Sequence, residues 1–284
     1  MNLCQDGYLR QLVRRVYVAG QVPDTLELRV SALKLVVPED AIVTDRTAGW
    51  LLGTDMALAP GDHLAVPPVS IFVNRRGGRL RNELSESGQR FLREDEIIEI
   101  MGLRLTSPLR TASDLGRLRH RDAAFAALTA VFRLGLFTRE ELLDFTGRFR
   151  GMRYVIQLRS FVTIVDARAE SFGEAVTHLR WRDTVSVVPD LQIEVERPGQ
   201  WSLRIDIGVE VLKYGIEYLG EKWHLLTAEQ REHDEERFAW LREERGWLID
   251  PVTKVNVFGH QRDIESIIVH GIQDARRRLR RTTS

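Results

Sequence analysis

The chain has 284 residues, of which 43% are hydrophobic and 29% are charged, and its formal net charge is +0 at pH 7. These values are typical of globular domains and exclude a disordered protein. The single cysteine, Cys4, excludes an intramolecular disulfide and a thiolate zinc cluster. Because the sequence has no apolar run of signal or membrane-spanning length, we expect a cytoplasmic protein without a membrane partner.

The first part, residues 1–105, predicts an αβ region of short strands. Apolar residues at helical spacing predict one helix within 26–37, and a second, short helix over 46–53 ends at Gly53. Segments rich in β-branched and aromatic residues predict strands at 12–20, 41–45, 63–68 and 70–76.

A turn in this region, residues 74–81 (NRRGGRLR), carries arginines on both sides of two glycines. Arg75, Arg76 and Arg79 are therefore candidates for contacts with nucleic-acid phosphates. The alternative is a hairpin tip in which the arginines are only solvated.

Residues 106–165 predict a helical connector. One helix begins at Pro108, an apolar helix runs to Gly135, and a further helix covers 152–165. Thr138 precedes Glu141 by three residues, which is the spacing of a capping box at the start of another helix. We expect these helices to pack as a small bundle.

The sequence of residues 166–273 predicts a separate domain with a mixed sheet and helices on its faces. Residues 274–284 are expected to form a basic tail. The alternation of patterns gives the order α–β–β–β–α–β–α. The expected helices are 170–182, 227–245 and 261–281, and the expected strands are 185–188 (VSVV), 191–196, 202–211, 214–220 and 247–255. The whole chain is therefore expected to belong to the α+β class.

Acidic residues occur near facing ends of two consecutive strands in this domain. If the segments before and after Glu210 pair as a hairpin, Asp206 and Glu217 lie on adjacent strands, and Glu174 on the preceding helix can approach the same end of the sheet. Carboxylates that converge from rigid elements are the usual ligands for a Mg²⁺ or Mn²⁺ ion that acts on a phosphodiester. The alternative is that Asp206 and Glu217 are only the outward residues of alternating strands.

Three basic residues complete this constellation. His224 is a candidate general base, Lys222 is a candidate for stabilising charge in the transition state, and Arg237 on the next helix is a candidate for DNA contact.

The C-terminal half resembles endonuclease-like domains related to very-short-patch mismatch repair nucleases, a branch of the PD-(D/E)XK fold. The resemblance spans about 166–253 and rests on the ordered segments ESFGEAVTHLR, RIDIG, EYLGEKWH, HDEER and LREERGW. It implies a DNA endonuclease with a divalent metal, in which Glu174, Asp206 and Glu217 are the acidic core and His224 is the flanking histidine.

The first part resembles the N-terminal region of AbiEi-type antitoxin-like proteins. The segments VRRVYVAG, AIVTDRTAGWLLG and GLRLTSPLRTASDLGR carry this resemblance. It implies a DNA-binding winged helix, of which this chain is expected to hold a truncated version, because the sequence begins almost at the wing.

The sequence departs from the nuclease pattern at several positions. Leu219 stands where the family has an aspartate, Asp250 follows the Gly-Trp pair, and Phe172-Gly173 replaces Pro-x before Glu174. The dipeptide Pro189-Asp190 matches the opening of the PD-(D/E)XK signature, but no acid-x-lysine triplet follows it, so we expect a turn there.

Three functions stay open from the sequence. The first is a Mg²⁺- or Mn²⁺-dependent DNA endonuclease weakened by Leu219. The second is a catalytically inactive, antitoxin-like DNA-binding regulator of transcription. The third is an interaction module that does not bind nucleic acid.

Overall fold

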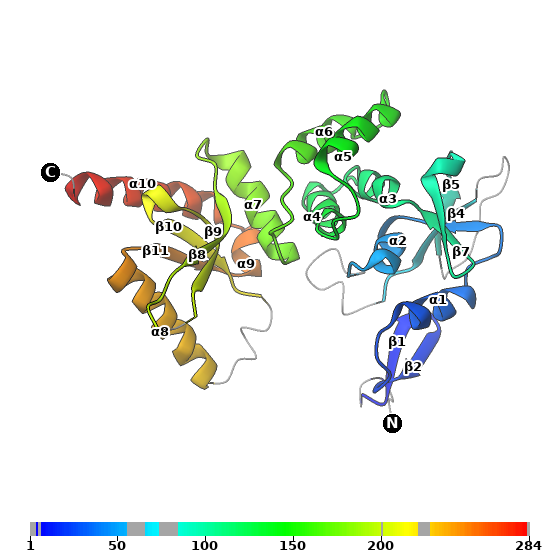
Figure 1. Ribbon diagram of the computed structural model, residues 1–284, viewed down its shortest axis with the longest axis horizontal. Helices are drawn as coiled ribbons and strands as arrows, with labels where there is room; N and C mark the ends of the chain where they lie inside the picture. Colours follow the sequence, from blue (N-terminus) through cyan, green and yellow to red (C-terminus); the bar gives the residue numbers. More distant parts are fainter. Residues whose placement is uncertain are drawn as a thin grey trace. The chain divides into compact units, whose positions relative to one another are not determined.

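The computed structural model describes residues 4, 7–55, 66–73, 85–199, 201–220 and 228–282. The chain divides into two compact units, Met1–Val165 and Asp166–Ser284, and each unit contains helices and sheet (Figure 1). This content confirms the expected α+β class. Among the helices of the described residues, none is both long and apolar enough to cross a membrane.

The first unit begins with an antiparallel hairpin and a helix, followed by a five-stranded sheet. The hairpin consists of β1 (Leu9–Val13) and β2 (Val16–Ala19), and the helix α1 (Leu26–Lys34) is capped by the side chain of Thr25. The sheet has the strand order β5-β4-β3-β7-β6. Its strands are β3 (Ala41–Val43), β4 (Val69–Val73), β5 (Ser85–Gln89), β6 (Ile97–Ile100) and β7 (Leu103–Thr106).

The core of this unit lies between α1, α2 (Asp45–Leu52) and the sheet. Leu33 of α1, Trp50 of α2, Ile71 of β4 and Leu105 of β7 belong to one buried apolar cluster. The short helix predicted over 46–53 is therefore present, and Gly53 ends it with a positive φ of 120°.

The predicted connector helices are part of this first unit. They are α3 (Pro108–Leu115), α4 (Arg121–Phe132), α5 (Arg139–Phe145) and α6 (Val155–Ile164), and α3 packs against α2 and α4. The capping box at the start of α5 is present, because the Thr138 side chain accepts from the Glu141 amide and Glu141 accepts from the Thr138 amide. Phe125 and Phe161 meet edge to face, with their ring centroids 5.1 Å apart.

The second unit has a four-stranded mixed sheet with the order β11-β10-β9-β8. The strands β8, β9 and β10 pair antiparallel, and β11 pairs parallel with β10. The elements in chain order are α7 (Phe172–Thr184), β8 (Asp190–Val195), β9 (Leu203–Val209), β10 (Tyr214–Tyr218), α8 (Ala228–Arg245), β11 (Leu248–Val252), α9 (Lys254–Val257) and α10 (Ile264–Thr282).

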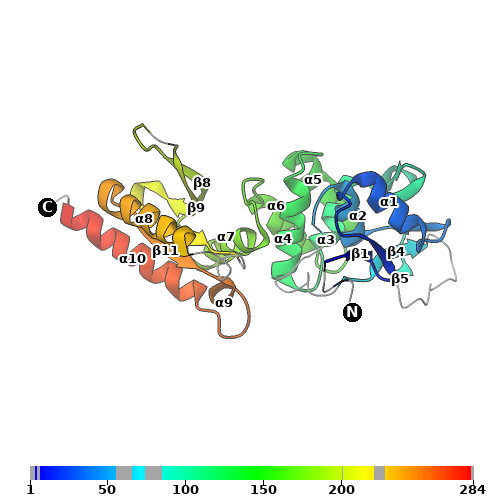
Figure 2. The same ribbon diagram turned by 90° about the horizontal axis from the view of Figure 1, so that it is seen from below.

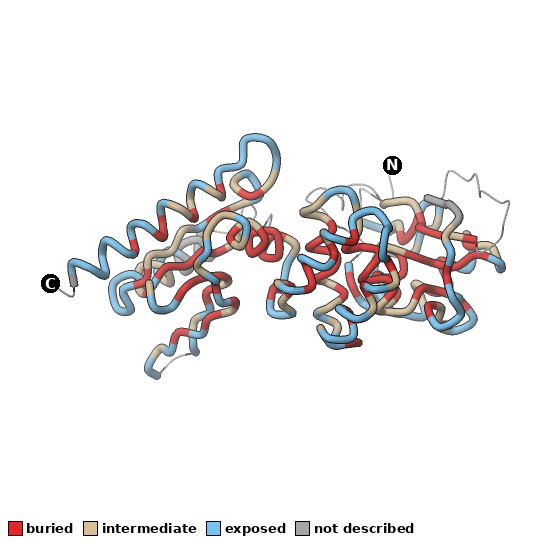
Figure 3. Tube along the Cα trace, turned by 90° about the horizontal axis from the view of Figure 1, so that it is seen from above, coloured by how far each residue is buried: buried red, intermediate tan, exposed pale blue. Residues whose placement is uncertain are grey.

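Helices pack against this sheet through two sets of apolar contacts. Leu241 of α8 forms a buried cluster with Trp247 and with Ile193 and Ile205 of the sheet. The ring of Tyr214 on β10 contacts the ring of Trp181 on α7. Figure 2 shows α8 and α10 as the two long helices of this unit, and Figure 3 shows that the C-terminal half of α10 is exposed.

Two sequence predictions in this unit are wrong. Residues 185–188 form no strand, because Val185 caps α7 and the Trp181 indole donates to the carbonyl of Val187 at 2.9 Å. The expected turn at Pro189-Asp190 is instead the start of β8, where Asp190 pairs with Gly208. In both cases the sheet partner, and not the local sequence, decides where the strand begins.

Candidate active site of the second unit

Asp206 and Glu217 lie opposite each other at the ends of two paired strands. In the register of β9 and β10, Gly215 pairs with Gly208 and Ile216 pairs with Ile207. Continued by one residue, this register places Glu217 opposite Asp206. The two carboxyl groups are close enough for the charge of Asp206 to raise the pKa of Glu217. Asp206 Oδ2 also accepts from the backbone amide of Tyr218 at 2.9 Å, which fixes its orientation.

Glu174 reaches this end of the sheet from the first turn of α7. The Ser171 hydroxyl caps the helix by accepting from the Glu174 amide at 3.1 Å. Glu174 Oε2 then accepts from the backbone amide of Glu170 and from the side-chain amide of Gln192, both at 2.9 Å. The cap and these two bonds hold the Glu174 carboxyl in one place.

Close packing at Gly173 brings the start of α7 up to β10. A Cβ atom at Gly173 would lie 2.0 Å from the ring of Tyr218, which is far too close for any side chain. Glycine at position 173 therefore permits the approach of helix and strand that carries Glu174 to the other two acids.

Burial raises the pKa of all three carboxyl groups of this acidic cluster, Glu174, Asp206 and Glu217, and the charge of Asp206 adds to this effect for Glu174 and Glu217. Burial, followed by the charge of Asp206, raises the pKa of Glu217 to about 8. The same two causes raise the pKa of Glu174, and burial raises the pKa of Asp206. Three acids with raised pKa values in one place mark a position that favours a bound cation.

Arg237 of α8 contacts the acidic cluster directly. Its Nη2 atom donates to Glu217 Oε1 and, at 2.9 Å, to the backbone carbonyl of Arg204. The sequence predicted Arg237 as a DNA-contacting residue, and the structure places its guanidinium on a carboxylate of the cluster.

Gln192 is a site residue that the sequence analysis missed. It lies on β8 at the position opposite Asp206, with a positive φ of 53°, and its Nε2 atom donates to Glu174. Its Oε1 atom is buried and has no hydrogen-bond partner within the described residues. A lone glutamine in a strand gives no signal in the sequence, and only the sheet register places it beside the acids.

The donor set of this site suits a hard divalent cation. Mg²⁺ and Mn²⁺ prefer carboxylate and carbonyl oxygens, and the acidic cluster together with the unpaired Gln192 Oε1 supplies these types. As the side chains are arranged, the described residues contain no group of three His, Cys, Asp or Glu side chains that holds an ion directly. Arg237 occupies one oxygen of Glu217, so an ion at this position competes with the guanidinium.

The structure does not describe the other predicted site residues, but it does describe two positions at which the sequence departs from the resembled pattern. Lys222, His224, Arg75, Arg76 and Arg79 lie outside the described residues. Leu219 is half-buried just after β10, and its backbone amide donates to the Val252 carbonyl at 2.7 Å. Asp250 accepts from the Tyr214 hydroxyl at 2.9 Å, apart from the acidic cluster.

Comparison of the chain with protein-family models, with curated proteins and with solved structures finds no match.

Proposed function

We propose that the second unit is a Mg²⁺- or Mn²⁺-dependent DNA endonuclease domain of the PD-(D/E)XK type, in a cytoplasmic protein whose partner is DNA. The observation that carries the proposal is the convergence of Glu174, Asp206 and Glu217 from three different elements into one buried cluster with raised pKa values. The resemblance of the ordered motifs to very-short-patch repair nucleases supports the same function.

Each residue of the site has a distinct role in this function. Glu174, Asp206 and Glu217 hold the ion, Gln192 orients Glu174, and His224 acts as the base toward the attacking water. Lys222 supplies positive charge near the scissile phosphate. When bound, the ion lowers the pKa of a bound water and stabilises the charge that develops on the phosphate.

A second candidate is a catalytically inactive, antitoxin-like DNA-binding regulator. Two observations favour it: the side chain of Leu219 has no oxygen to offer a cation, and the guanidinium of Arg237 already occupies one oxygen of Glu217. The resemblance of the first unit to AbiEi-type proteins supports a regulator as well.

One cleavage experiment separates these candidates. Supercoiled, linear and single-stranded DNA are incubated with the full-length protein and Mg²⁺ or Mn²⁺, with EDTA as the blank. The Asp206→Asn variant tests the site, and Asp190→Asn is the matched control because Asp190 is an exposed acid of the same sheet. We expect Asp206→Asn to lower cleavage by roughly 100-fold or more, since a ligand carboxylate contributes several kcal/mol and each 1.36 kcal/mol is tenfold.

Three other outcomes have clear meanings. Cleavage that persists in Asp206→Asn overturns the site. No cleavage by the wild type, together with salt-sensitive retention of DNA in a gel, favours the regulator. No retention of DNA overturns both candidates and leaves the interaction module.

A further inference from the structure

Seven charged side chains of the first unit form one connected network. Asp45 begins α2, Arg90 follows β5, Glu96 precedes β6, three residues belong to the region of α3, and Arg148 follows α5. The members of this arginine network are Asp45, Arg90, Glu96, Arg110, Asp114, Arg117 and Arg148.

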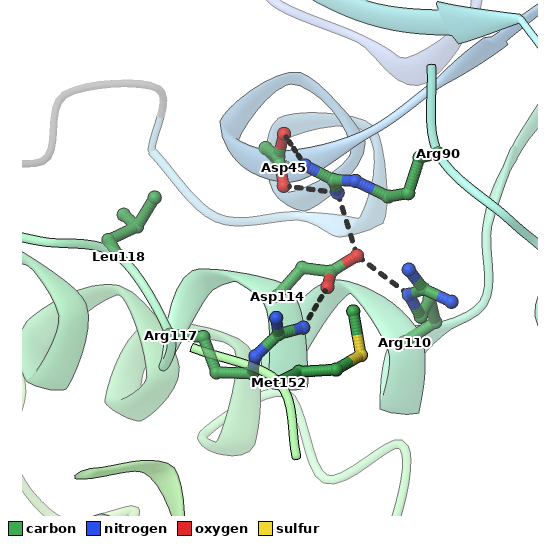
Figure 4. Close-up of a pocket in the computed structure, with 7 residues that line it drawn as sticks. All are labelled: Asp45, Arg90, Arg110, Asp114, Arg117, Leu118 and Met152. Atoms are coloured by element: carbon green, nitrogen blue, oxygen red, sulfur yellow. Dashed lines mark hydrogen bonds and ion pairs between the residues drawn. The ribbon is translucent and has the colours of Figure 1, made fainter. Parts of the chain in front are cut away.

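Asp114 is the centre of the arginine network (Figure 4). It accepts from Arg90 at 2.7 Å, from Arg110 at 2.7 Å and from Arg117 at 3.1 Å. Arg110 bridges Asp114 to the fully buried Glu96, with a distance of 2.7 Å from its Nη1 atom to Glu96 Oε2. Arg148 binds the other oxygen of Glu96.

The arginine network has a net charge of +1, because it contains four arginines and three carboxylates. Arg117 is the arginine with the least compensation: it shares Asp114 with two other guanidiniums, and its Nε atom donates to a neutral backbone carbonyl at Arg153. Its Nη2 atom makes no hydrogen bond to any described residue. Burial lowers the pKa of Arg117, and the charges of Arg110 and Arg90 add to this effect.

A pocket of about 160 Å³ opens beside this surplus charge. Its lining consists of Asp45, Arg90, Arg110, Asp114, Arg117, Leu118 and Met152. Figure 4 shows the guanidiniums of Arg110 and Arg117 on either side of Asp114, with Met152 beside them. The guanidinium of Arg117 lies over the ring of Phe149, 4.4 Å from its centroid, which holds its plane in one orientation.

We infer that this pocket binds a small oxyanion of the phosphate class, with Arg117 as its principal donor. A phosphate group supplies the negative charge that the arginine network lacks and accepts from Nη2, on the unused edge of the Arg117 guanidinium, which is a strong charge-assisted pairing. A pocket of this size is large enough for a phosphate group, because one water molecule needs only roughly 10–15 Å³ of such space. Inorganic phosphate is the simplest ligand of this class.

The test is calorimetric titration of the full chain with inorganic phosphate in the absence of DNA, with ionic strength held constant by chloride. We expect saturable binding of one phosphate per chain. Arg117→Gln should weaken it by about tenfold or more, because it removes a charge-assisted pair. Arg104→Gln is the matched control, since Arg104 is an exposed arginine of β7 outside the arginine network, and it should leave the affinity unchanged.

A second pair of variants tests the pocket without disturbing the network. Met152 lines the pocket and is 46% exposed, so it accepts a polar residue. Met152→Glu places a carboxylate where the anion belongs and should abolish phosphate binding, whereas Met152→Gln should retain it. Absence of saturable binding by the wild type at millimolar phosphate overturns the inference, and so does unchanged affinity in Met152→Glu. Neither result depends on whether the second unit cleaves DNA.

Discussion

Glu217 and Asp206 face each other at the paired ends of β9 and β10, and the charge of Asp206 helps burial to raise the pKa of Glu217 to about 8. Two buried carboxyl groups that repel each other do not both ionise readily, and the raised pKa of Glu217 means that Glu217 is mostly protonated at neutral pH. In the absence of a cation, this proton and Arg237 therefore offset the repulsion between the two acids.

The stability of the second unit should fall in alkaline solution because of Glu217. Burial raises the pKa of Glu217 from 4.5 to about 8, so its contribution to stability is fully present below pH 4.5 and is lost as the pH rises through 8. Glu217→Gln removes this loss and should raise the free energy of unfolding by about 1–3 kcal/mol at pH 9 relative to the wild type. The measurement is urea unfolding between pH 5 and pH 9 in EDTA.

The control for this comparison is Glu194→Gln, which changes an exposed glutamate of β8. Its unfolding should depend on pH in the same way as that of the wild type. A Glu217→Gln curve parallel to the wild-type curve would show that Glu217 is ionised throughout this range.

Leu219→Asp should strengthen divalent-cation binding. Leu219 follows β10 directly, so an aspartate at this position adds a carboxylate next to the acidic cluster. A fourth acid at this end of the sheet should lower the Kd for Mn²⁺ by roughly tenfold, and any cleavage of DNA should increase. Calorimetry with Mn²⁺ measures the affinity.

Leu219→Asn is the control for that variant, because it has a similar shape without the charge. Equal Mn²⁺ affinity in the Asp and Asn variants would show that position 219 does not face the ion. Whichever result is found at position 219, Asp206→Asn should abolish Mn²⁺ binding.

Gly173→Ala should destabilise the second unit. The added Cβ would lie 2.0 Å from the ring of Tyr218, so α7 or the ring must shift. The expected cost is about 1–3 kcal/mol, which is typical of overpacking in a core. Thermal unfolding checks this, and Gly220→Ala serves as the control because a Cβ at Gly220 meets no atom of the described residues within 4 Å. Equal melting temperatures for the two variants would contradict the close approach of α7 and β10.

Arg110→Met should destabilise the first unit strongly. Arg110 is 3% exposed and bridges two buried acids, so its removal leaves carboxylates with incomplete compensation. Breaking a buried ion pair in this way costs about 3–5 kcal/mol. Hydrogen exchange of the backbone amides of α3 and β7 should quicken accordingly, whereas Arg104→Met at an exposed position should leave it unchanged. Equal exchange in both variants would show that the arginine network adds no stability.

Local patterns were sufficient to predict much of the architecture. The capping box at Thr138, the helix end at Gly53 and the α+β class are all confirmed. These features depend on residues only a few positions apart, because hydrogen bonds within one turn and the spacing of apolar residues decide them. Local patterns failed at residues 185–190, where the strand boundary depends on a partner from β9.

The sequence by itself determined that Asp206 and Glu217 lie on consecutive strands near a common end, since alternation and a hairpin leave little freedom. Only the tertiary structure decided that Gln192 holds Glu174 and that Arg237 holds Glu217. It also assembled the arginine network from residues as far apart as Asp45 and Arg148. The physical reason is that buried charges choose partners by proximity after helices and sheets have packed, and this proximity is not encoded in the spacing of residues along the chain.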